Sequence, residues 1–411
     1  MHLDRDAGTR MAYASIATWA FFLYFVGPVT PLAAAQWGVS SQLAGLIGIA
    51  LAGGLITVGL LGAPLVTRWG RQGSGIRAAV LLAGAAGVLV VAPAFPFVLL
   101  GVYLGACAGA LLMNVATAAL ADRHGSAGPR ALTEANAAAA WIGLLSPLLL
   151  GLAIGIGFGW RVVAAVVAVV AVLLGIVLSR VPLVESSHRH RVLDVADTAF
   201  EVDEPTSTST GPAMRRPLPR LFLVSLAAIV SAVGTEVALN FWGAVLLSAR
   251  TGADLAMTTA ALSVLIAGIA VGRTVGASLT RRFAVAPLIY VSLALAGAGF
   301  LIVWVSPWLA AGIGGLFVTG LGFALLFPLT SSLALSHAGG QTDRAMAIIA
   351  VVIGATMGAA PFLLGAVAGT VGVTAGFVIV PVLLLVGAAA VRVATRIGRD
   401  SATPIATRLP L

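Results

Sequence analysis

Lysine is absent from the sequence, and charged residues of all kinds make up only 9% of its 411 residues. Soluble domains usually carry about 25% charged residues, so a chain this poor in charge lacks the polar surface that water requires. Apolar residues take the place of the missing charge: 60% of the chain is hydrophobic, and its mean hydropathy is +1.08. The composition therefore predicts a protein whose solvent is largely lipid.

Residues that could form disulfides, bind metals or catalyse reactions are equally scarce. Cys107 is the single cysteine, so the chain cannot form an intramolecular disulfide. His188 and His190 lie in a polar interval without further ligands beside them, which argues against a metal site. The sequence also contains no Walker motif and no arrangement of a nucleophile with a base, which argues against an ATP-driven pump and against an enzyme. We therefore expect no catalytic residues, no metal and no cofactor.

Long apolar runs recur along the whole chain. A bilayer core about 30 Å thick needs roughly 20 apolar residues per helix. Runs of about that length fall at twelve places, namely residues 11–35, 42–67, 77–95, 97–121, 131–156, 159–179, 221–248, 256–279, 285–305, 308–335, 344–370 and 374–394. They are continuously apolar rather than alternating, which favours helices over barrel strands. The predicted fold class is an all-α membrane protein with twelve transmembrane helices.

The arginines indicate how these helices are oriented. If the N-terminus lies inside, every arginine except Arg161, Arg250 and Arg273 falls on the cytoplasmic side, as the positive-inside rule requires. Both termini are then cytoplasmic. The formal charge of +9 is explained by this topology and by contact with anionic lipid, and it gives no support to nucleic-acid binding.

Repetition divides the chain into two similar parts. At a constant offset, Arg130-Ala131 matches Arg344-Ala345, and residues 147–151 match residues 361–365. We predict a six-helix bundle over residues 1–180, a cytoplasmic linker over 181–219, a second six-helix bundle over 220–398 and a tail over 399–411. Because six is even, the two bundles run in the same direction, and a substrate is expected between them near the midplane of the membrane.

The turn after the second apolar run carries a recognisable pattern. Residues 63–72 read APLVTRWGRQ, and the corresponding turn of the major facilitator superfamily resembles Gly-x-Leu-Ala-Asp-Arg-x-Gly-Arg-Lys. The matching residues are Leu65, Arg68, Gly70 and Arg71. A second copy, over residues 276–283, keeps a glycine and an arginine of the pattern. The chain thus resembles this superfamily over nearly its whole length, which implies two parallel six-helix repeats and transport by alternating access.

Thr67 and Thr280 stand where the superfamily pattern has an aspartate. Threonine can form hydrogen bonds but brings no charge, so we predict a weaker latch on the cytoplasmic side than a carboxylate would give. Arg68, Arg71 and Arg281 are then expected mainly to fix the topology and to contact lipid headgroups; the alternative is a specific gate.

Glu236 is the carboxylate that stands out within an apolar run. It lies sixteen residues after Arg220, or ~24 Å along a helix. An unpaired charge is costly at that depth, which favours a group that takes up and releases a proton. Thr235, Asn240 and Trp242 lie on the same face or on an adjoining stripe. We expect these residues to line a cavity with Glu236 as the proton-coupling site; the alternative is a structural glutamate bonded to a neighbouring helix.

Arg273 is the second charge placed within a predicted span. It lies eight residues before Arg281, hence ~12 Å inside the cytoplasmic boundary. In the cavity it could hold an anionic substrate or pair with Glu236. The alternative is that its long side chain reaches back to the cytoplasmic surface.

The remaining polar residues allow either a structural or a functional interpretation. Arg130 and Glu134, one helical turn apart, are predicted to form an i,i+4 ion pair at the cytoplasmic end of the fifth span. Four small polar residues of the fourth and tenth spans can donate hydrogen bonds to a substrate or bind helices together. They are Asn114, Thr117, Thr330 and Ser331.

These observations predict a transporter rather than an enzyme. We expect secondary active transport of a small organic solute, amphipathic or sugar-like, by alternating access with proton coupling. An anion transporter that uses Arg273 as its ligand, and a receptor that binds a solute without moving it, remain alternatives. The expected partners are the solute, protons and membrane lipids, and the expected state is a monomer in a bacterial inner membrane.

Overall fold

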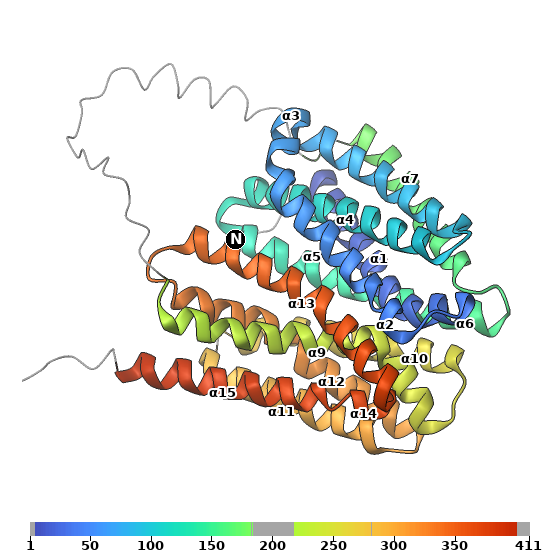
Figure 1. Cartoon of the computed structure of the whole chain (residues 1–411). Helices are drawn as coiled ribbons and strands as arrows, with labels where there is room; N and C mark the ends of the chain where they lie inside the picture. Colours follow the sequence, from blue (N-terminus) through green and yellow to red (C-terminus); the bar gives the residue numbers. More distant parts are fainter. Residues whose placement is uncertain (1–4, 182, 184–217, 281, 401–411) are drawn as a thin grey trace, which may run out of the picture.

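The structure, a computed structural model, describes residues 5–181, 183, 218–280 and 282–400, and within these residues it is all-helical (Figure 1). The N-half comprises α1 (Ala7–Trp37), α2 (Ser41–Ala44), α3 (Leu46–Val91), α4 (Phe95–His124), a 3-10 turn (Gly125–Ala127), α5 (Gly128–Gly143), α6 (Leu145–Gly155) and α7 (Arg161–Arg180). The C-half comprises α9 (Arg220–Thr251), α10 (Leu255–Leu279), α11 (Val285–Val305), α12 (Leu309–Ser336), α13 (Thr342–Val371), α14 (Val373–Gly376) and α15 (Ile379–Asp400). Arg281, His188 and His190 lie outside the described residues.

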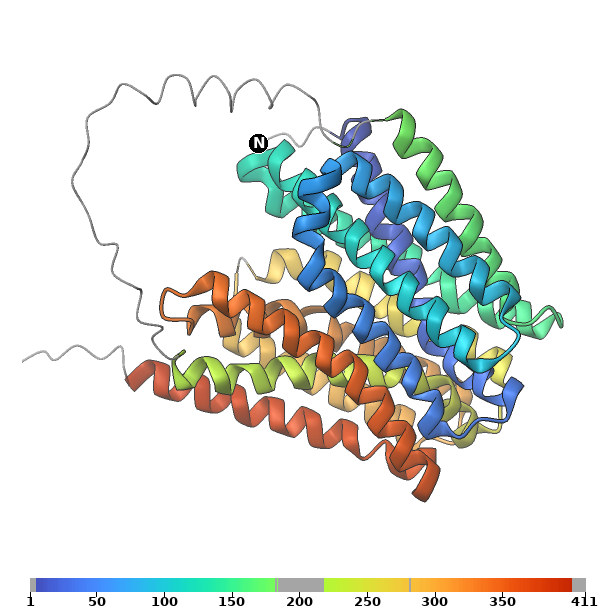
Figure 2. The same cartoon turned by 45° about the horizontal axis from the view of Figure 1, so that its top comes forward.

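Among the described residues, 11 helical stretches are long and apolar enough to cross a membrane. The stretch Ser41–Val91 has 51 residues, which is ~77 Å of helix and more than twice the thickness of a bilayer core. Gly70 interrupts it with φ 69° and ψ 166°, a backbone conformation that suits only glycine. The chain bends there (Figure 2), between the spans predicted at 42–67 and 77–95.

Apolar side chains fill the interior of each half and also cover its outside. Phe22 and Phe25 are fully buried in the N-half, as is Phe300 in the C-half. Leu60 and Leu385, in contrast, expose more than half of their surface. A surface this apolar has no counterpart in soluble domains and is what contact with lipid tails requires.

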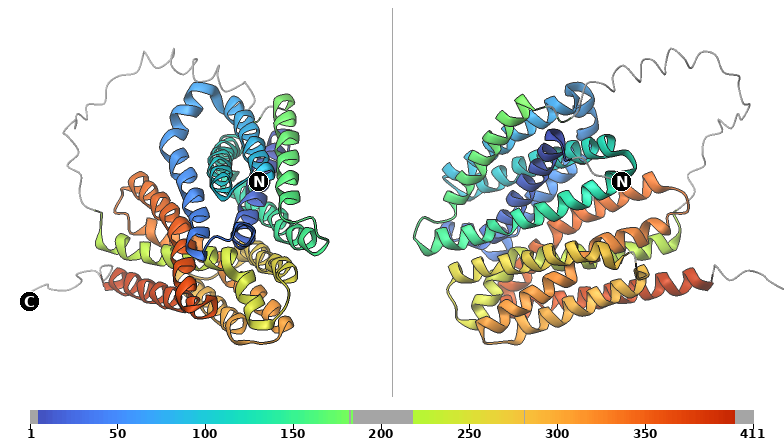
Figure 3. Two further views of the ribbon diagram at one scale, coloured as in Figure 1. Left: turned by 45° about the vertical axis from the view of Figure 1, so that its right-hand side comes forward. Right: turned by 180° about the vertical axis from the view of Figure 1, so that it is seen from behind.

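The two halves meet through small residues toward one end of the molecule. The α13 helix packs on α2 and α3, and α10 packs on α5 and α6. A Cβ at Gly358 of α13 would lie 2.8 Å from the Cβ of Ala52 on α3, and a Cβ at Gly151 of α6 would lie 2.6 Å from that of Ala260 on α10. The region where α6 meets α10 lies at the end of the molecule remote from residues 180 and 220 (Figures 2 and 3), whereas Gly358 lies near the middle of α13. The halves therefore hold together from the middle of α13 to the end opposite to their connection.

Candidate functional site

Glu236 and Tyr24 form a polar contact between the halves. The hydroxyl of Tyr24, on α1, donates to Oε1 of Glu236, on α9, at 3.5 Å. Tyr24 is 7% exposed and its ring lies against Gly143 of α5, where a Cβ would be 2.5 Å from the Tyr24 Cδ2. Glu236 is half-buried. A carboxyl group in the membrane-spanning part of the C-half thus faces a hydroxyl held rigidly by the N-half.

One helical turn further along α9, Asn240 packs against Gly27 of α1. A Cβ at position 27 would collide with the Asn240 side chain, so glycine allows the two helices to approach. Asn240 is 9% exposed, and its Oδ1 has no hydrogen-bond partner among the described residues. The α1–α9 interface therefore carries a carboxyl group and an unused amide oxygen on successive turns, as the sequence spacing predicts.

Arg273 extends this polar group from a third helix. Its side chain, on α10, is half-buried, and α10 packs against α9, the helix that carries Glu236. Within the described residues, no ion pair joins Arg273 to Glu236 at 4.0 Å or less. The guanidinium of Arg273 is thus not held by the carboxylate of Glu236.

Trp242 and Thr235 lie on the same helix as Glu236 but contribute to the packing of the C-half. Trp242 is 3% exposed, and its indole Nε1 donates to the carbonyl of Pro361 on α13 at 3.1 Å. The Thr235 hydroxyl is fully buried and donates to the carbonyl of Ser231 at 2.7 Å. Both polar groups are therefore already used inside the protein.

The predicted polar residues of α4 and α12 differ in whether the protein already uses their hydrogen-bonding groups. Thr330 donates to the carbonyl of Leu326 at 2.7 Å. Thr117 and Ser331 each bury a hydroxyl that has no hydrogen-bond partner among the described residues, while Asn114 is exposed. Corresponding helices of the two halves thus each carry a hydroxyl without a partner among the described residues.

The basic turn after the first part of α3 is stabilised within the N-half. Arg71 forms an ion pair with Asp122 at the end of α4. Thr67 donates to the carbonyl of Ala63, one turn earlier, at 3.0 Å. Asp122 thus supplies the negative charge that position 67 lacks, and the sequence analysis missed it because 51 residues separate it from Arg71. Arg68 is exposed at this turn.

Gln72, where the superfamily pattern has lysine, holds the chain that follows α7. Its Oε1 accepts from the backbone N–H of Leu183 at 2.8 Å, and its Nε2 donates to the carbonyl of Val181 at 3.3 Å. Arg123 donates to the carbonyl of Leu183 at 2.8 Å. The start of the connection between the halves is therefore fixed to α3 and α4.

Glu134 also takes part in contacts within the N-half. Its Oε1 forms an ion pair with Nε of Arg130, one turn away, at 3.4 Å, and its Oε2 accepts from Arg5 at 3.0 Å. The predicted i,i+4 pair is therefore present, and Arg5 adds a second cation that the sequence analysis did not assign. Thr280, of the second basic turn, lies at the end of α10.

Hydrogen bonds join histidines to hydroxyls at equivalent places in the two halves. His124, at the end of α4, lies 2.9 Å from the Thr9 hydroxyl of α1. His337, after α12, lies 3.1 Å from the Ser225 hydroxyl of α9. Burial lowers the pKa of His337 below its usual value. These paired contacts repeat the internal symmetry that the sequence shows.

Asp6 is the N-cap residue of α1. Its carboxylate accepts from the backbone N–H of Thr9 at 2.8 Å and from Arg123 at 2.6 Å. Partial burial acts to raise the pKa of this carboxyl, but the bonds from Thr9 and Arg123 outweigh it and lower the pKa. No group of three potential metal ligands occurs among the described residues.

Solved structures share this fold. A bacterial homologue of the human lysosomal transporter Spinster, in an inward-facing and occupied conformation, is 14% identical, with a TM-score of 0.72 over 98% of this chain and 100% of that chain. A D-xylose–proton symporter is 15% identical, with a TM-score of 0.72 over 94% and 96% of the two chains. A peptide transporter, POT, is 16% identical, with a TM-score of 0.71 over 95% of each chain.

No curated protein matches the sequence. The sequence does match the family model described as Major Facilitator Superfamily, over residues 12–339. That match covers most of the chain and includes the basic turn around Gly70, the Glu236 region of α9 and Arg273 of α10. The all-helical fold and the match together identify a multi-pass membrane protein of the transporter type, and the chain belongs to the Major Facilitator Superfamily.

Proposed function

We propose that the protein is a secondary active transporter that moves a small organic solute by alternating access and couples this movement to protons through Glu236. The observation that carries the proposal is the contact between Tyr24 and Glu236, which joins the halves. Rocking of one half against the other would change that contact. Protonation changes the carboxyl group from an anion to a neutral group, so binding of one proton can favour one arrangement over the other.

The proposal includes twelve membrane crossings. The stretch Ser41–Val91 then crosses twice, with its turn at Gly70, while the other long helices cross once each. On this proposal both termini and the connection between the halves lie in the cytoplasm, which the positive-inside rule supports. A monomer in a bacterial inner membrane, in contact with lipid on its apolar outer faces, fits this arrangement.

A neutral or amphipathic solute, such as a sugar-like molecule, suits the polar groups that remain unused. Asn240, Thr117 and Ser331 each offer a buried polar atom without a hydrogen-bond partner among the described residues. A hydroxyl or an amide of a solute would form hydrogen bonds with these atoms without burying a charge. The D-xylose–proton symporter of the same fold gives a precedent for this combination of substrate and ion.

One observation favours an anionic substrate as the second candidate. Arg273 is half-buried near Glu236 and forms no ion pair with it within the described part of the chain. A buried guanidinium that is not neutralised by a carboxylate attracts a carboxylate or phosphate of a solute. On this alternative, Arg273 would be the principal ligand and Glu236 would serve mainly to balance charge.

The experiment is a solute screen on proteoliposomes that contain a pH-sensitive dye. Sugars, organic anions and amphipathic cations are added in turn to vesicles with wild-type protein, Glu236→Gln or Glu134→Gln. The last variant removes a carboxylate of the N-half surface and is the matched control. We expect a solute-evoked proton flux in the wild type and in the control but not in Glu236→Gln. A solute that crosses equally well in all three without any proton flux would contradict the proton site, and a solute that binds without crossing would indicate a receptor.

A further inference from the structure

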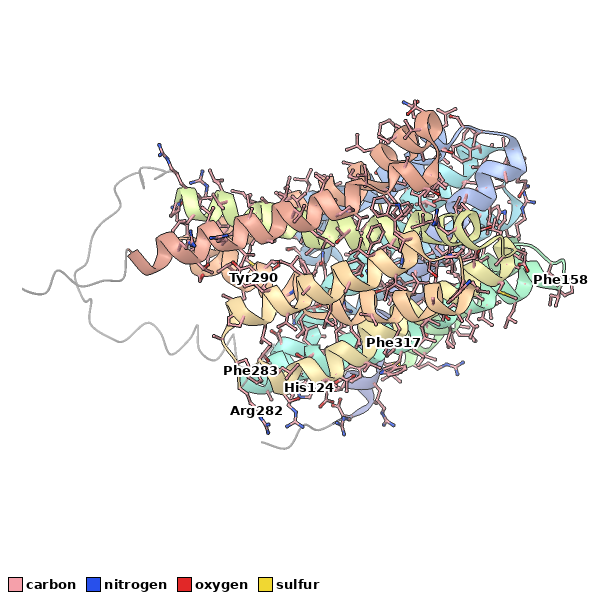
Figure 4. All side chains as sticks on the ribbon, turned by 90° about the horizontal axis from the view of Figure 1, so that it is seen from below. His124, Phe158, Arg282, Phe283, Tyr290 and Phe317 are labelled. Atoms are coloured by element: carbon pink, nitrogen blue, oxygen red, sulfur yellow. The ribbon has the colours of Figure 1, made fainter. Side chains whose placement is uncertain are left out.

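A basic groove lies between α11 and α15 of the C-half. Its volume is about 450 Å³, and it is lined by Ala286, Pro287, Tyr290, Arg392, Thr395 and Arg396. Figure 4 shows Tyr290 toward the same end of the molecule as Arg282 and Phe283, with Phe158 at the opposite end. None of the lining residues belongs to α1, α9 or α10, so the groove is separate from the candidate transport site.

The two arginines of the groove have no acidic partner among the described residues. Arg392 and Arg396 lie one turn apart on α15, and both side chains are exposed. Within the described residues, neither guanidinium forms an ion pair. The Thr395 hydroxyl between them donates to the carbonyl of Val391 at 2.8 Å. Two like charges at this spacing repel each other, and an anion between them would relieve the repulsion.

On the proposed topology, the groove lies near the level of the lipid headgroups. α15 starts at Ile379, so Arg392 and Arg396 lie ~20 and ~26 Å along the helix, near the boundary of a bilayer core ~30 Å thick. Toward the membrane interior, Leu385 of α15 and Val291 of α11 are exposed apolar side chains. Tyr290, which is 38% exposed, is of the residue type that gathers at membrane interfaces.

We propose that this groove binds the phosphate group of an anionic phospholipid in the membrane leaflet on the side of the linker. Arg392 and Arg396 would contact the phosphate oxygens, since a guanidinium presents paired donors to an oxyanion. Tyr290 and Pro287 would lie against the glycerol and the upper part of an acyl chain. The adjoining apolar surface is what distinguishes a lipid from a free phosphate ion, which would leave that surface uncovered. The proposal is independent of the transported solute.

The test counts the lipids that stay with the purified protein. Protein in detergent micelles that contain equal amounts of phosphatidylcholine and phosphatidylglycerol is examined by native mass spectrometry. The proteins compared are the wild type, Arg392→Gln/Arg396→Gln, Tyr290→Leu and Arg180→Gln/Arg220→Gln. The last variant removes two exposed arginines of α7 and α9 that do not line the groove and leaves the net charge equal to that of the first. We expect preferential retention of phosphatidylglycerol by the wild type. Removal of the groove arginines should reduce the amount of bound phosphatidylglycerol about fivefold for each arginine. The Tyr290 variant should lose less phosphatidylglycerol, and the control should bind as much as the wild type.

Equal loss in the two double variants, or retention in all of them, would overturn the proposal, because a diffuse positive surface would then explain the binding. Displacement of phosphatidylglycerol by millimolar inorganic phosphate would also overturn it in favour of a soluble phosphate. If the double variant does not fold, as judged by its circular dichroism spectrum, the single variants Arg392→Gln and Arg396→Gln carry the same comparison.

Discussion

Replacing Gly358 by alanine should push the two halves apart at the end where they now touch. A Cβ at Gly358 lies 2.8 Å from the Cβ of Ala52, whereas ordinary van der Waals contact begins at 3.4 Å. The helices α13 and α3 must therefore separate locally by about 0.6 Å, and crowding of this kind costs ~1–3 kcal/mol. The cost applies only while the halves are in contact there. The ratio of molecules open at that end to molecules closed there should therefore rise ~5–150-fold.

Distances between two spin labels measure this change. Labels at Phe158→Cys in the N-half and Trp308→Cys in the C-half, in a Cys107→Ala background, report on that end of the molecule, and both positions are exposed. Gly358→Ala should move the distribution toward longer distances. Gly369→Ala is the matched control, because it lies on the same helix and a Cβ there meets nothing within 4 Å. Identical distributions in the two variants would refute the reasoning.

Three further changes have expected outcomes. Tyr24→Phe removes the hydroxyl that contacts Glu236, and proton-driven uptake should fall about fivefold with solute binding retained, as measured in proteoliposomes. His337 has a lowered pKa, so its contribution to stability is complete above its usual value of 6.5 and is lost as the pH falls below it; His337→Gln should reduce the fall in melting temperature between neutral and mildly acidic pH. Asp122→Asn breaks an exposed ion pair, and the free energy of unfolding should fall by less than about 1 kcal/mol, with uptake unchanged.

Each of these expectations can fail in a defined way. Uptake by Tyr24→Phe that equals the wild type would show that the contact between the halves has no part in coupling. A melting temperature of His337→Gln with the wild-type pH dependence would assign the acid sensitivity to other groups. Loss of transport in Asp122→Asn, with stability preserved, would mean that the basic turn is a gate rather than an anchor.

The membrane-spanning character of the chain could be predicted because it depends on local composition. The long apolar runs fold as helices, with 131–156 and 374–394 each divided between two helices, and the kink that divides Ser41–Val91 falls at a glycine with a positive φ. The position of this kink within one continuous helical stretch could not be predicted, because the basic residues of the turn suggested a longer interruption between two separate helices. The internal repeat was likewise visible in the positions of prolines and arginines.

The candidate site was only partly predictable, for a physical reason. Glu236 and Arg273 are conspicuous because a charge in an apolar run is costly wherever its partner lies. Tyr24 is not conspicuous, because tyrosine is common in apolar segments, and its contact joins residues 212 positions apart. Helical spacing placed Trp242 near Glu236, but spacing does not reveal which side of a helix packs against its neighbours. The structure shows the indole bonded to Pro361.

The central claim is that Glu236 carries the coupled proton, and the direct test separates driven uptake from exchange. With a solute identified by the screen, proteoliposomes are assayed for accumulation driven by a pH gradient and for exchange of labelled against unlabelled solute without a gradient. Glu236→Gln is compared with Glu134→Gln. The account predicts that Glu236→Gln retains exchange and loses driven accumulation, while the control retains both. Driven accumulation that survives in Glu236→Gln would contradict the account and would direct attention to Arg273.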